Sequence, residues 1–474
     1  MKINMRYFLV VLCLCVATSV HAEEICIIDR PSIVERIENR TYPSVFGAWN
    51  HELINYPKPD SVWEWSYLKD MRAHFDLFWG GENFRGVQFR FTSEESHLVS
   101  LGGLEHGVYE RNEVQKLNPN HLLLASLYYY GAHPETYPED WPYWLRDEEG
   151  NRIQDEGWKE LLIDYTHPGA QDHFVQRAIA IAQCGIFDGI FLDWWAGEDR
   201  EDTLGEPGTA DLYHSNTADA RISLLRRIRE AVGDDFLIIA NTTTHKVPRS
   251  APYLNGAFME TFGNYSREHV IEIENALSWY EENFRYPQVN CLQAVSIPNE
   301  PLNSPRNQQW ARMFTALSLT HSNGYVWFHG QYSYSYWYNF WDTDLGHLVG
   351  GDETKRQLYE NREGLFIREF TNGWAVYNRS GKAQEVEFPE VVSGVASGVT
   401  EKRLHVLPDL DGEIYLKSES QLETSPTADI NGDGVVNVLD LVLVANALGE
   451  EAPDLNGDGI VNILDLVIVA NAFE

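Results

Sequence analysis

The stretch that decides the fold is GIFDGIFLDWW, residues 185–195. Its centre, Ile190–Leu192, is a short apolar run, and the run ends on the carboxylate Asp193. Such a run, with turn-forming residues before it, is typical of a strand that is covered on both faces, as in a parallel sheet. Similar runs recur along the chain. Together they predict eight strands at residues 44–49, 75–79, 122–129, 189–193, 236–241, 256–261, 291–297 and 325–329.

The segments between these runs carry helical periodicity, and this alternation predicts a β/α fold. Eight strands in roughly 330 residues fit a (β/α)8 TIM barrel over residues 23–352. A mixed open sheet is the alternative, although no GxGxxG or P-loop motif supports a nucleotide-binding version of it. Residues 356–418 follow with short alternating runs broken by Asn-Gly, Ser-Gly and Asp-Gly, which predict a small antiparallel β domain.

The C-terminal part of the chain contains one loop written twice. DINGDGVVNVLD begins at Asp429, and DLNGDGIVNILD begins at Asp454. Oxygen donors at loop positions 1, 3, 5, 9 and 12, a main-chain carbonyl at position 7 and glycine at position 6 form the pattern of an EF-hand calcium loop. The predicted ligands of two Ca²⁺ ions are Asp429, Asn431, Asp433, Val435, Asn437 and Asp440 in the first loop, and Asp454, Asn456, Asp458, Ile460, Asn462 and Asp465 in the second.

The two loops depart from an ordinary EF-hand because position 12 is aspartate and no helix leads into either loop. Residues 419–427, rich in Ser, Thr and Pro, are typical of a linker. The helix expected after each loop is apolar nearly all round, so we expect it to be buried. Residues 429–449 and 454–474 are identical at 15 of 21 positions, which predicts two helices packed about a pseudo-twofold axis.

This duplicated half EF-hand resembles a type I dockerin. The resemblance implies an all-α, calcium-binding module over residues 428–474 that docks onto a cohesin domain of a scaffold or cell-surface protein. In dockerins, loop positions 10 and 11 usually help to select the cohesin. Here they are apolar, which is compatible with a hydrophobic docking surface: Val438, Leu439, Ile463 and Leu464. The alternative is a calcium-stabilised C-terminal cap without a partner.

The N-terminus and the composition indicate an exported protein. Residues 1–22, with Lys2 and Arg6 before an apolar run and small residues at the cleavage position, are typical of a secretory signal peptide. The apolar run, residues 8–17, is too short to span a membrane. The three remaining cysteines, Cys26, Cys184 and Cys291, allow at most one internal disulfide. A formal net charge of −35 argues against nucleic acid and anionic membranes as partners.

Two carboxylates at predicted strand ends are the candidate catalytic residues. Asp193 ends the fourth strand and Glu260 lies at the end of the sixth, in FMETFG, and barrel strands direct their C-terminal ends toward the active site. A pair of carboxylates is the minimum equipment for glycoside hydrolysis. Structural roles are the alternatives: a cap or ion pair for Asp193, and a partner for Arg267 in the case of Glu260.

These segments, together with FDLFWGG at residues 75–81 and IREFTNGWAVYN at 367–378, resemble TIM-barrel glycoside hydrolases related to endo-α-1,4-polygalactosaminidase. The resemblance covers most of residues 44–418. It implies a nucleophilic Asp after strand four and an acid/base Glu after strand six, which are Asp193 and Glu260 here, and it favours retention of configuration.

Further residues near strand ends are candidate substrate contacts. Asp164 alternatively orients its own turn, and Asn241 either hydrogen-bonds a sugar hydroxyl or is structural. Two clusters rich in Trp and Tyr, at residues 127–144 and 325–341, predict stacking platforms for sugar rings, with loop packing as the alternative. The candidates in or near these clusters are Tyr129, Trp195, Trp327, His329 and Tyr332.

Taken together, the sequence predicts a secreted glycoside hydrolase of polysaccharides, tethered to a cohesin through a calcium-dependent dockerin. No cofactor is expected for catalysis, since no HExxH or other clustered ligand pattern supports a catalytic metal. No GxSxG motif supports a serine nucleophile as the alternative. A carbohydrate-binding barrel without turnover and a scaffold or adhesion component are the rival hypotheses.

Overall fold

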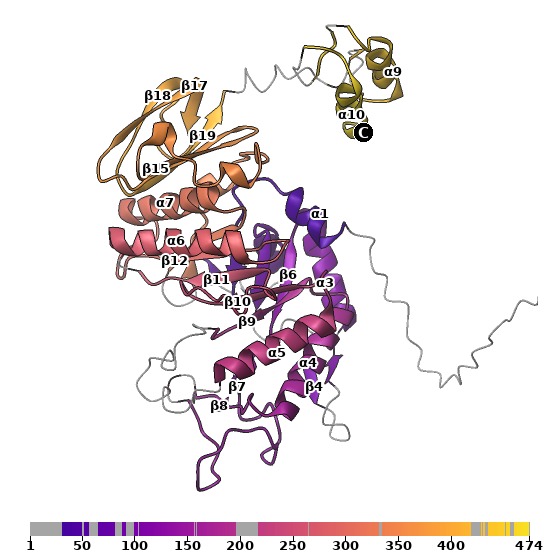
Figure 1. The fold of residues 1–474 in the computed structure, drawn as a ribbon, viewed down its shortest axis with the longest axis vertical. Coiled ribbons are helices and arrows are strands. Elements are labelled where there is room, and N and C mark those ends of the chain that lie inside the picture. The colour runs from indigo at the N-terminus through magenta and orange to yellow at the C-terminus, as the bar shows by residue number, and fades with distance from the viewer. Residues whose placement is uncertain are drawn as a thin grey trace, which may run out of the picture.

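The largest part of the chain is a parallel β-barrel surrounded by helices (Figure 1). The computed structural model describes residues 31–49, 52–55, 65–80, 88–91, 99–102, 104–155, 157, 159–195, 217–263, 265–330, 334–418, 428, 430–431, 435–450, 452–455 and 459–473. Neighbouring barrel strands pair in parallel in the order β1 (Phe46–Ala48), β3 (Leu77–Gly80), β6 (Leu122–Ser126), β9 (Gly189–Leu192), β10 (Leu237–Asn241), β11 (Gly256–Glu260), β12 (Cys291–Val295) and β13 (Tyr325–His329).

A bridge between the first and last of these strands joins the ends of the sheet. Val45 pairs in parallel with Val326, and the Val326 amide donates to the Ser44 carbonyl at 3.0 Å. All eight predicted strands are present, and each observed boundary lies within three residues of the predicted one. The predicted TIM barrel is therefore confirmed, and the open sheet is not the observed arrangement.

Helices connect most of the strands on the outside of the barrel. They are α2 (Trp65–Ala73), α3 (Leu104–Leu117), α4 (Pro168–Gln183), α5 (Thr217–Val232), α6 (Arg267–Asn283) and α7 (Pro305–His321), with the short α1 (Ile33–Glu38) before β1. Local signals begin them: Ser266 and Ser304 cap α6 and α7 by accepting main-chain hydrogen bonds, and Pro305 occupies the first turn of α7. Residues 242–255, between β10 and β11, form turns and contain no α-helix. No helix in the described part of the chain is long and apolar enough to cross a membrane.

Short strands decorate the barrel. They are β2 (Glu52–Leu53) and β14 (Tyr334–Ser335), which extend the barrel sheet, and two separate pairs, β4 (Gln88–Phe91) with β5 (Val99–Gly102) and β7 (Gly131–Ala132) with β8 (Leu161–Leu162).

One glycine and one buried ion pair hold β9, the strand at the centre of residues 185–195, in its place in the sheet. A side-chain carbon at Gly189 would collide with the Leu237 carbonyl of β10, so only glycine allows this close strand approach. Before it, the buried Asp188 pairs with Arg36 and accepts a bond from the Leu123 amide at 2.9 Å. The two aspartates that flank β9 therefore lie at opposite ends of the barrel. Asp188, before the strand, stabilises the barrel through its ion pair, whereas Asp193 follows the C-terminal end of the strand.

The predicted antiparallel β domain is also present. Its five strands, in the order β15 (Leu365–Phe370), β16 (Gly373–Asn378), β19 (Asp411–Lys417), β17 (Gln384–Gly394) and β18 (Lys402–Leu407), form one sheet that packs against α7 (Figure 1). One face contributes a cluster around Phe370 and Ile414 that contacts Leu319 of α7. Three short 3₁₀ turns precede it: η2 (Asn339–Trp341), η3 (Asp352–Thr354) and η4 (Tyr359–Asn361).

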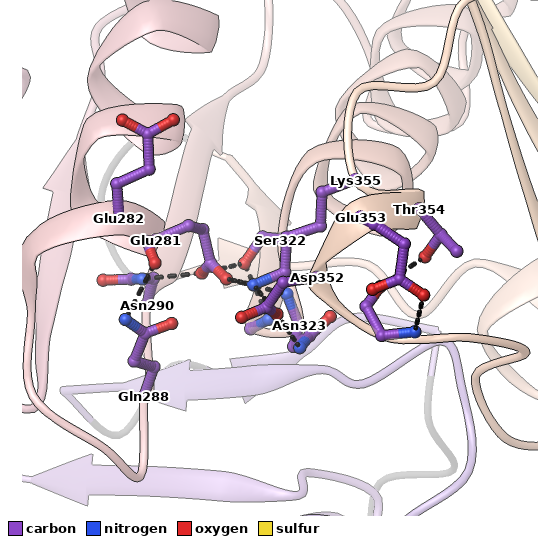
Figure 2. A network of polar contacts seen from close by, with 12 residues as sticks. Glu281, Glu282, Gln288, Asn290, Ser322, Asn323, Asp352, Glu353, Thr354 and Lys355 are labelled. Carbon is purple, nitrogen blue, oxygen red and sulfur yellow. Dashed lines mark hydrogen bonds and ion pairs between the residues drawn. The ribbon is translucent and has the colours of Figure 1, made fainter.

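Charged pairs tie this β domain and the preceding segment to the barrel helices. Figure 2 shows Glu281 of α6 in one such network, where its carboxylate accepts from Lys355 at 2.5 Å, Asn290 at 2.6 Å and Ser322 at 2.6 Å. Arg368 of β15, fully buried, donates to the Leu319 and Ser322 carbonyls at the C-terminal end of α7. The β domain is thus held to the barrel by hydrogen-bonded charges as well as by apolar packing.

The C-terminal repeat folds into two matching helices, α9 (Val438–Asn446) and α10 (Ile463–Asn471), which contact each other. The expectation that both are buried is wrong. Each helix buries a single apolar residue, Val444 or Val469, in a small core with Leu455 and Val461. Two nine-residue helices offer each other only one stripe, so the remaining apolar residues stay on the surface.

The expected signal peptide, Cys26 and the expected linker at residues 419–427 lie outside the described residues. Cys184 and Cys291 both have free thiols.

Candidate active site

The two predicted catalytic carboxylates lie at the C-terminal ends of β9 and β11, on either side of β10. Asp193 follows β9, Asn241 ends β10 and Glu260 ends β11, so three adjacent strands deliver three polar side chains to one place. The Asn241 side-chain nitrogen Nδ2 donates to Asp193 Oδ1 at 2.9 Å and to Glu260 Oε2 at 2.8 Å. These two oxygens are therefore separated by no more than the sum of the two bonds, about 5.7 Å.

The structural alternative for Glu260 is not observed. Arg267, the partner considered for it, instead pairs with Asp409 of the segment before β19. Asp193 accepts from the amide of the next residue, Trp194, at 2.9 Å, and among the described residues it forms no ion pair.

A strained turn immediately after Asp193 positions its carboxylate. Trp194 has a φ of 54°, in the left-handed region that a residue with a bulky side chain seldom adopts, and this turn directs its N–H to the carboxylate. Two side chains secure the turn by donating to the Trp194 carbonyl: the Tyr129 hydroxyl at 3.0 Å and Arg221 at 3.3 Å. Backbone strain concentrated beside a partly exposed carboxylate is typical of functional sites.

Both carboxyls are partly exposed, and desolvation raises the pKa of each. Burial raises the pKa of Asp193, while the bonds from Asn241 and Trp194 act in the opposite direction. Burial also raises the pKa of Glu260; the bond from Asn241 opposes this, and the charge of Asp193 adds to it. Asp193 thus has two donors, whereas Glu260 has one donor and a negative neighbour, which favours the proton on Glu260.

Four of the predicted aromatic and histidine contacts are buried. Tyr129 and Trp195 are each 1% exposed, and Trp195 donates to Ser250. Trp327 and His329 stack on each other with centroids 4.2 Å apart, His329 contacts Gln293, and burial lowers the pKa of His329 to about 4. A ring buried on both faces has none free for a sugar, so in this structure these residues serve the framework of the site. Tyr332 lies outside the described residues.

Asp164 is engaged in its own turn. Its carboxylate accepts from the Thr166 amide at 3.2 Å and from the Thr166 hydroxyl, just before α4. This is the local role that the sequence left open as its alternative. The strand before it, β8, pairs with β7 outside the barrel sheet.

Three aromatic residues not selected from the sequence have exposed surface near the carboxylates. Trp194 and Tyr130 are partly exposed, and their rings lie 5.7 Å apart. Phe262, two residues after Glu260, is 65% exposed. The aromatic runs YYY, residues 128–130, and DWW, residues 193–195, were visible in the sequence. The sequence alone did not show which ring of each run is exposed.

The two C-terminal loops enclose the carboxylate of their twelfth residue. Asp440 is buried and accepts from the main-chain amides of Ile430, Asn431 and Asn437 at 2.8, 3.0 and 2.9 Å. Asp465 repeats this with Leu455 and Asn462 at 2.6 and 2.7 Å. Carboxylate, side-chain amide and main-chain carbonyl oxygens are the donors that calcium prefers, so the residue types at these loop positions fit that ion. Of the predicted ligands, Asp429, Asp433, Asn456 and Asp458 lie outside the described residues.

Comparison with protein-family models matches residues 126–374 to hypothetical glycosyl hydrolase family 15. This match includes Asp193, Asn241 and Glu260 and covers more than half of the chain. The chain belongs to this glycosyl hydrolase family. A second model, the dockerin type I domain, matches residues 427–474. The predicted class of enzyme and the predicted dockerin are thus both confirmed, whereas the similarity to polygalactosaminidases in particular is not.

Solved structures that resemble this family member are remote. A noncanonic maltogenic α-amylase from Thermotoga neapolitana is 10% identical, with 79% of this chain and 99% of that chain covered and a TM-score of 0.45. A β-L-arabinopyranosidase from Geobacillus stearothermophilus is 11% identical, with 81% and 99% covered and a TM-score of 0.46. A search of curated proteins gives no match.

Proposed function

We propose that the barrel hydrolyses a glycosidic bond of a polysaccharide with Asp193 as nucleophile and Glu260 as acid/base. The observation that supports this most directly is the shared contact to Asn241, which holds the two carboxyl groups about 5.7 Å apart or less at their nearest oxygens. Retaining glycosidases have carboxyl groups about 5 to 5.5 Å apart, whereas inverting ones need about 6.5 to 9.5 Å to admit a water. The short separation favours retention.

The reaction then proceeds in two balanced steps. Ionised Asp193 attacks the anomeric carbon, the glycosidic C–O bond breaks, and protonated Glu260 gives its proton to the departing oxygen. In the second step Glu260, now a carboxylate, takes a proton from water while the water oxygen attacks the same carbon and releases Asp193. The hydrogen-bond difference between the two carboxyls matches the protonation states that the first step requires.

Exposed rings beside the pair support a sugar as the ligand. Tyr130 and Trp194, whose rings contact each other, and Phe262, two residues after Glu260, offer exposed apolar surface to the C–H groups of a pyranose. Which sugar is bound is a matter for a screen of amino-sugar, galactose-based and glucose-based polymers by release of reducing ends.

The test of the catalytic pair uses Asp193→Asn and Glu260→Gln, with Asp164→Asn as the matched exchange of carboxylate for amide outside the pair. We expect both site variants to lose at least about a thousandfold in kcat/KM and the control to stay within a few-fold. The anomeric configuration of the first product, read by ¹H NMR, should equal that of the substrate. Full activity in both site variants would refute the assignment, and an inverted product would refute the nucleophile.

The dockerin supports a second proposal, that the enzyme is exported and docks on a cohesin in a calcium-dependent way. Val438, Leu439, Ile463 and Leu464, at loop positions 10 and 11, are all exposed, so the predicted docking surface is available. Two bound calcium ions per chain by calorimetry, and loss of cohesin binding with EGTA, are the expected results. Cohesin binding that persists in EGTA would contradict the proposal.

A further inference from the structure

Asn241 occupies a place that its predicted role as a sugar ligand does not explain. Its Nδ2 carries two hydrogens, and both are engaged, one with Asp193 and one with Glu260. Its oxygen Oδ1 accepts from the Thr243 amide at 3.2 Å. Because a main-chain N–H can only donate, this bond fixes which end of the amide faces the carboxylates.

The residue is also held firmly at the backbone. Asn241 is buried, and its carbonyl accepts from the Trp195 amide at 2.9 Å, which ties the end of β10 to the turn after β9. Its strand pairs with β11 in register with Phe258. An amide anchored on a barrel strand between the two carboxyl-bearing strands can set their separation.

On this geometry we propose that Asn241 is a positioning residue, whose amide nitrogen clamps Asp193 and Glu260 at the separation for retention and holds Asp193 in its ionised form. The inference rests on the proposed function of the pair. With Trp194 supplying the second donor to Asp193 alone, the clamp leaves Glu260 as the carboxyl that keeps the proton.

Other charged and titratable groups near the clamp do not replace it. The Tyr130 phenol, whose pKa burial and the charges of Asp193 and Glu160 raise, stays neutral and close to Asp193. Arg221 donates to the Trp194 carbonyl, one peptide away from the carboxylate. His245 contacts the hydroxyl of Thr243 on the far side of the amide. Among the described residues, the amide of Asn241 is the group bonded to both carboxyls.

The experiment compares Asn241→Ala and Asn241→Asp with Asn255→Asp. Asn255 is a buried asparagine just before β11 that bonds Arg229 and the Ile238 amide, so its exchange perturbs the barrel without touching the pair. The first readout is the pH profile of kcat/KM on a substrate from the polymer screen. The second is the ¹³C titration of the Asp193 carboxyl in protein labelled with [γ-¹³C]aspartate, assigned through Asp193→Asn.

Asn241→Ala should lower kcat/KM about a hundredfold through lost positioning and move both limbs of the profile up by about one pH unit, because each carboxylate loses a donor. Asn241→Asp should move them further, since it adds a third carboxylate. The Asp193 titration should rise in parallel, and Asn255→Asp should leave both readouts in place.

The clamp would be overturned if Asn241→Ala left both limbs of the pH profile and the titration of the Asp193 carboxyl unchanged. This holds however low the activity of the variant is. The carboxyl titration needs no substrate, so it judges the clamp even if Asp193→Asn and Glu260→Gln retain activity and the proposed function fails.

Discussion

The ion pair between Glu274 of α6 and Arg379, just after β16, makes a quantitative prediction about how the β domain is held. Arg379 donates to both Glu274 oxygens, at 2.6 and 2.7 Å. Burial raises the pKa of Glu274, but the bonds and charges of Arg379 and His321 outweigh it and bring the pKa to about 2. The same arginine also contacts Glu363 at 3.4 Å, but that side chain is 80% exposed. One cation therefore has a buried and a solvated partner.

The expected magnitude follows from linkage. A pKa lowered from 4.5 to about 2 corresponds to about 3.4 kcal/mol at pH 7, at 1.36 kcal/mol for each unit. Because the folded-state pKa is depressed, this stability is present above pH 4.5 and is lost as the pH falls toward 2; at pH 3 about 1.4 kcal/mol remains. With an unfolding entropy near 0.8 kcal/mol/K for about 390 residues, Glu274→Gln should lower Tm by about 4 °C at pH 7.

The assay is thermal unfolding followed by tryptophan fluorescence at pH 7 and pH 3. Residues 428–474 contain no tryptophan, so the signal reports the barrel and β domain and not the dockerin. Glu363→Gln is the matched control and should change Tm by less than about 1 °C, since exposed pairs contribute little. Equal shifts for the two variants, or a Glu274→Gln shift that does not shrink at pH 3, would refute the reasoning.

Three further outcomes are expected. Phe262→Ala should raise KM about fivefold with a smaller effect on kcat, because an exposed stacking face is lost. Phe262→Tyr keeps an aromatic ring and should keep the wild-type KM. An unchanged KM in the alanine variant would argue against a stacking platform at this residue. Gly189→Ala should destabilise the barrel by about 1–3 kcal/mol through collision with the Leu237 carbonyl, read by the same unfolding assay, and an unaltered Tm would contradict the close approach. EGTA should reduce the helical circular dichroism of residues 428–474 without changing tryptophan emission; a parallel loss of emission would show that the barrel depends on the metal.

The side-chain contacts of the β domain serve its own core and its attachment to the barrel. Among the described residues its large aromatic rings are mostly buried in its own core, as with Trp374, Phe388 and Tyr415, or turned to the barrel, as with Phe366 and Tyr377. Its strands and turns supply Arg368, Arg379, Asp409 and Asp411 to bonds with α6 and α7. A sheet that directs its charges inward to two barrel helices braces the strands that carry the site.

Local pattern was enough for the architecture of this chain and for the location of its carboxylates. Apolar runs of strand length identified all eight barrel strands, and the carboxyl ends of barrel strands converge whatever the loops do, so Asp193 and Glu260 could be named as a pair. The same logic marked Asn241 as a strand-end residue. It did not reveal that one nitrogen serves both acids, because that depends on distances across three strands.

The sequence by itself determined the barrel, the β domain and the repeated loops, since each is written in periodicity and spacing along a short stretch. The tertiary structure decided which faces are covered. Strand β6 ends at Ser126, so the tyrosines that follow leave its alternation. Trp195, after β9, and Tyr165, before α4, pack on Tyr129, while Tyr130 stays partly exposed. Likewise α9 and α10 are apolar all round, but a pair of short helices buries only one stripe of each. Exposure is settled by what packs against a residue from elsewhere in the chain, and that is not written in its local pattern.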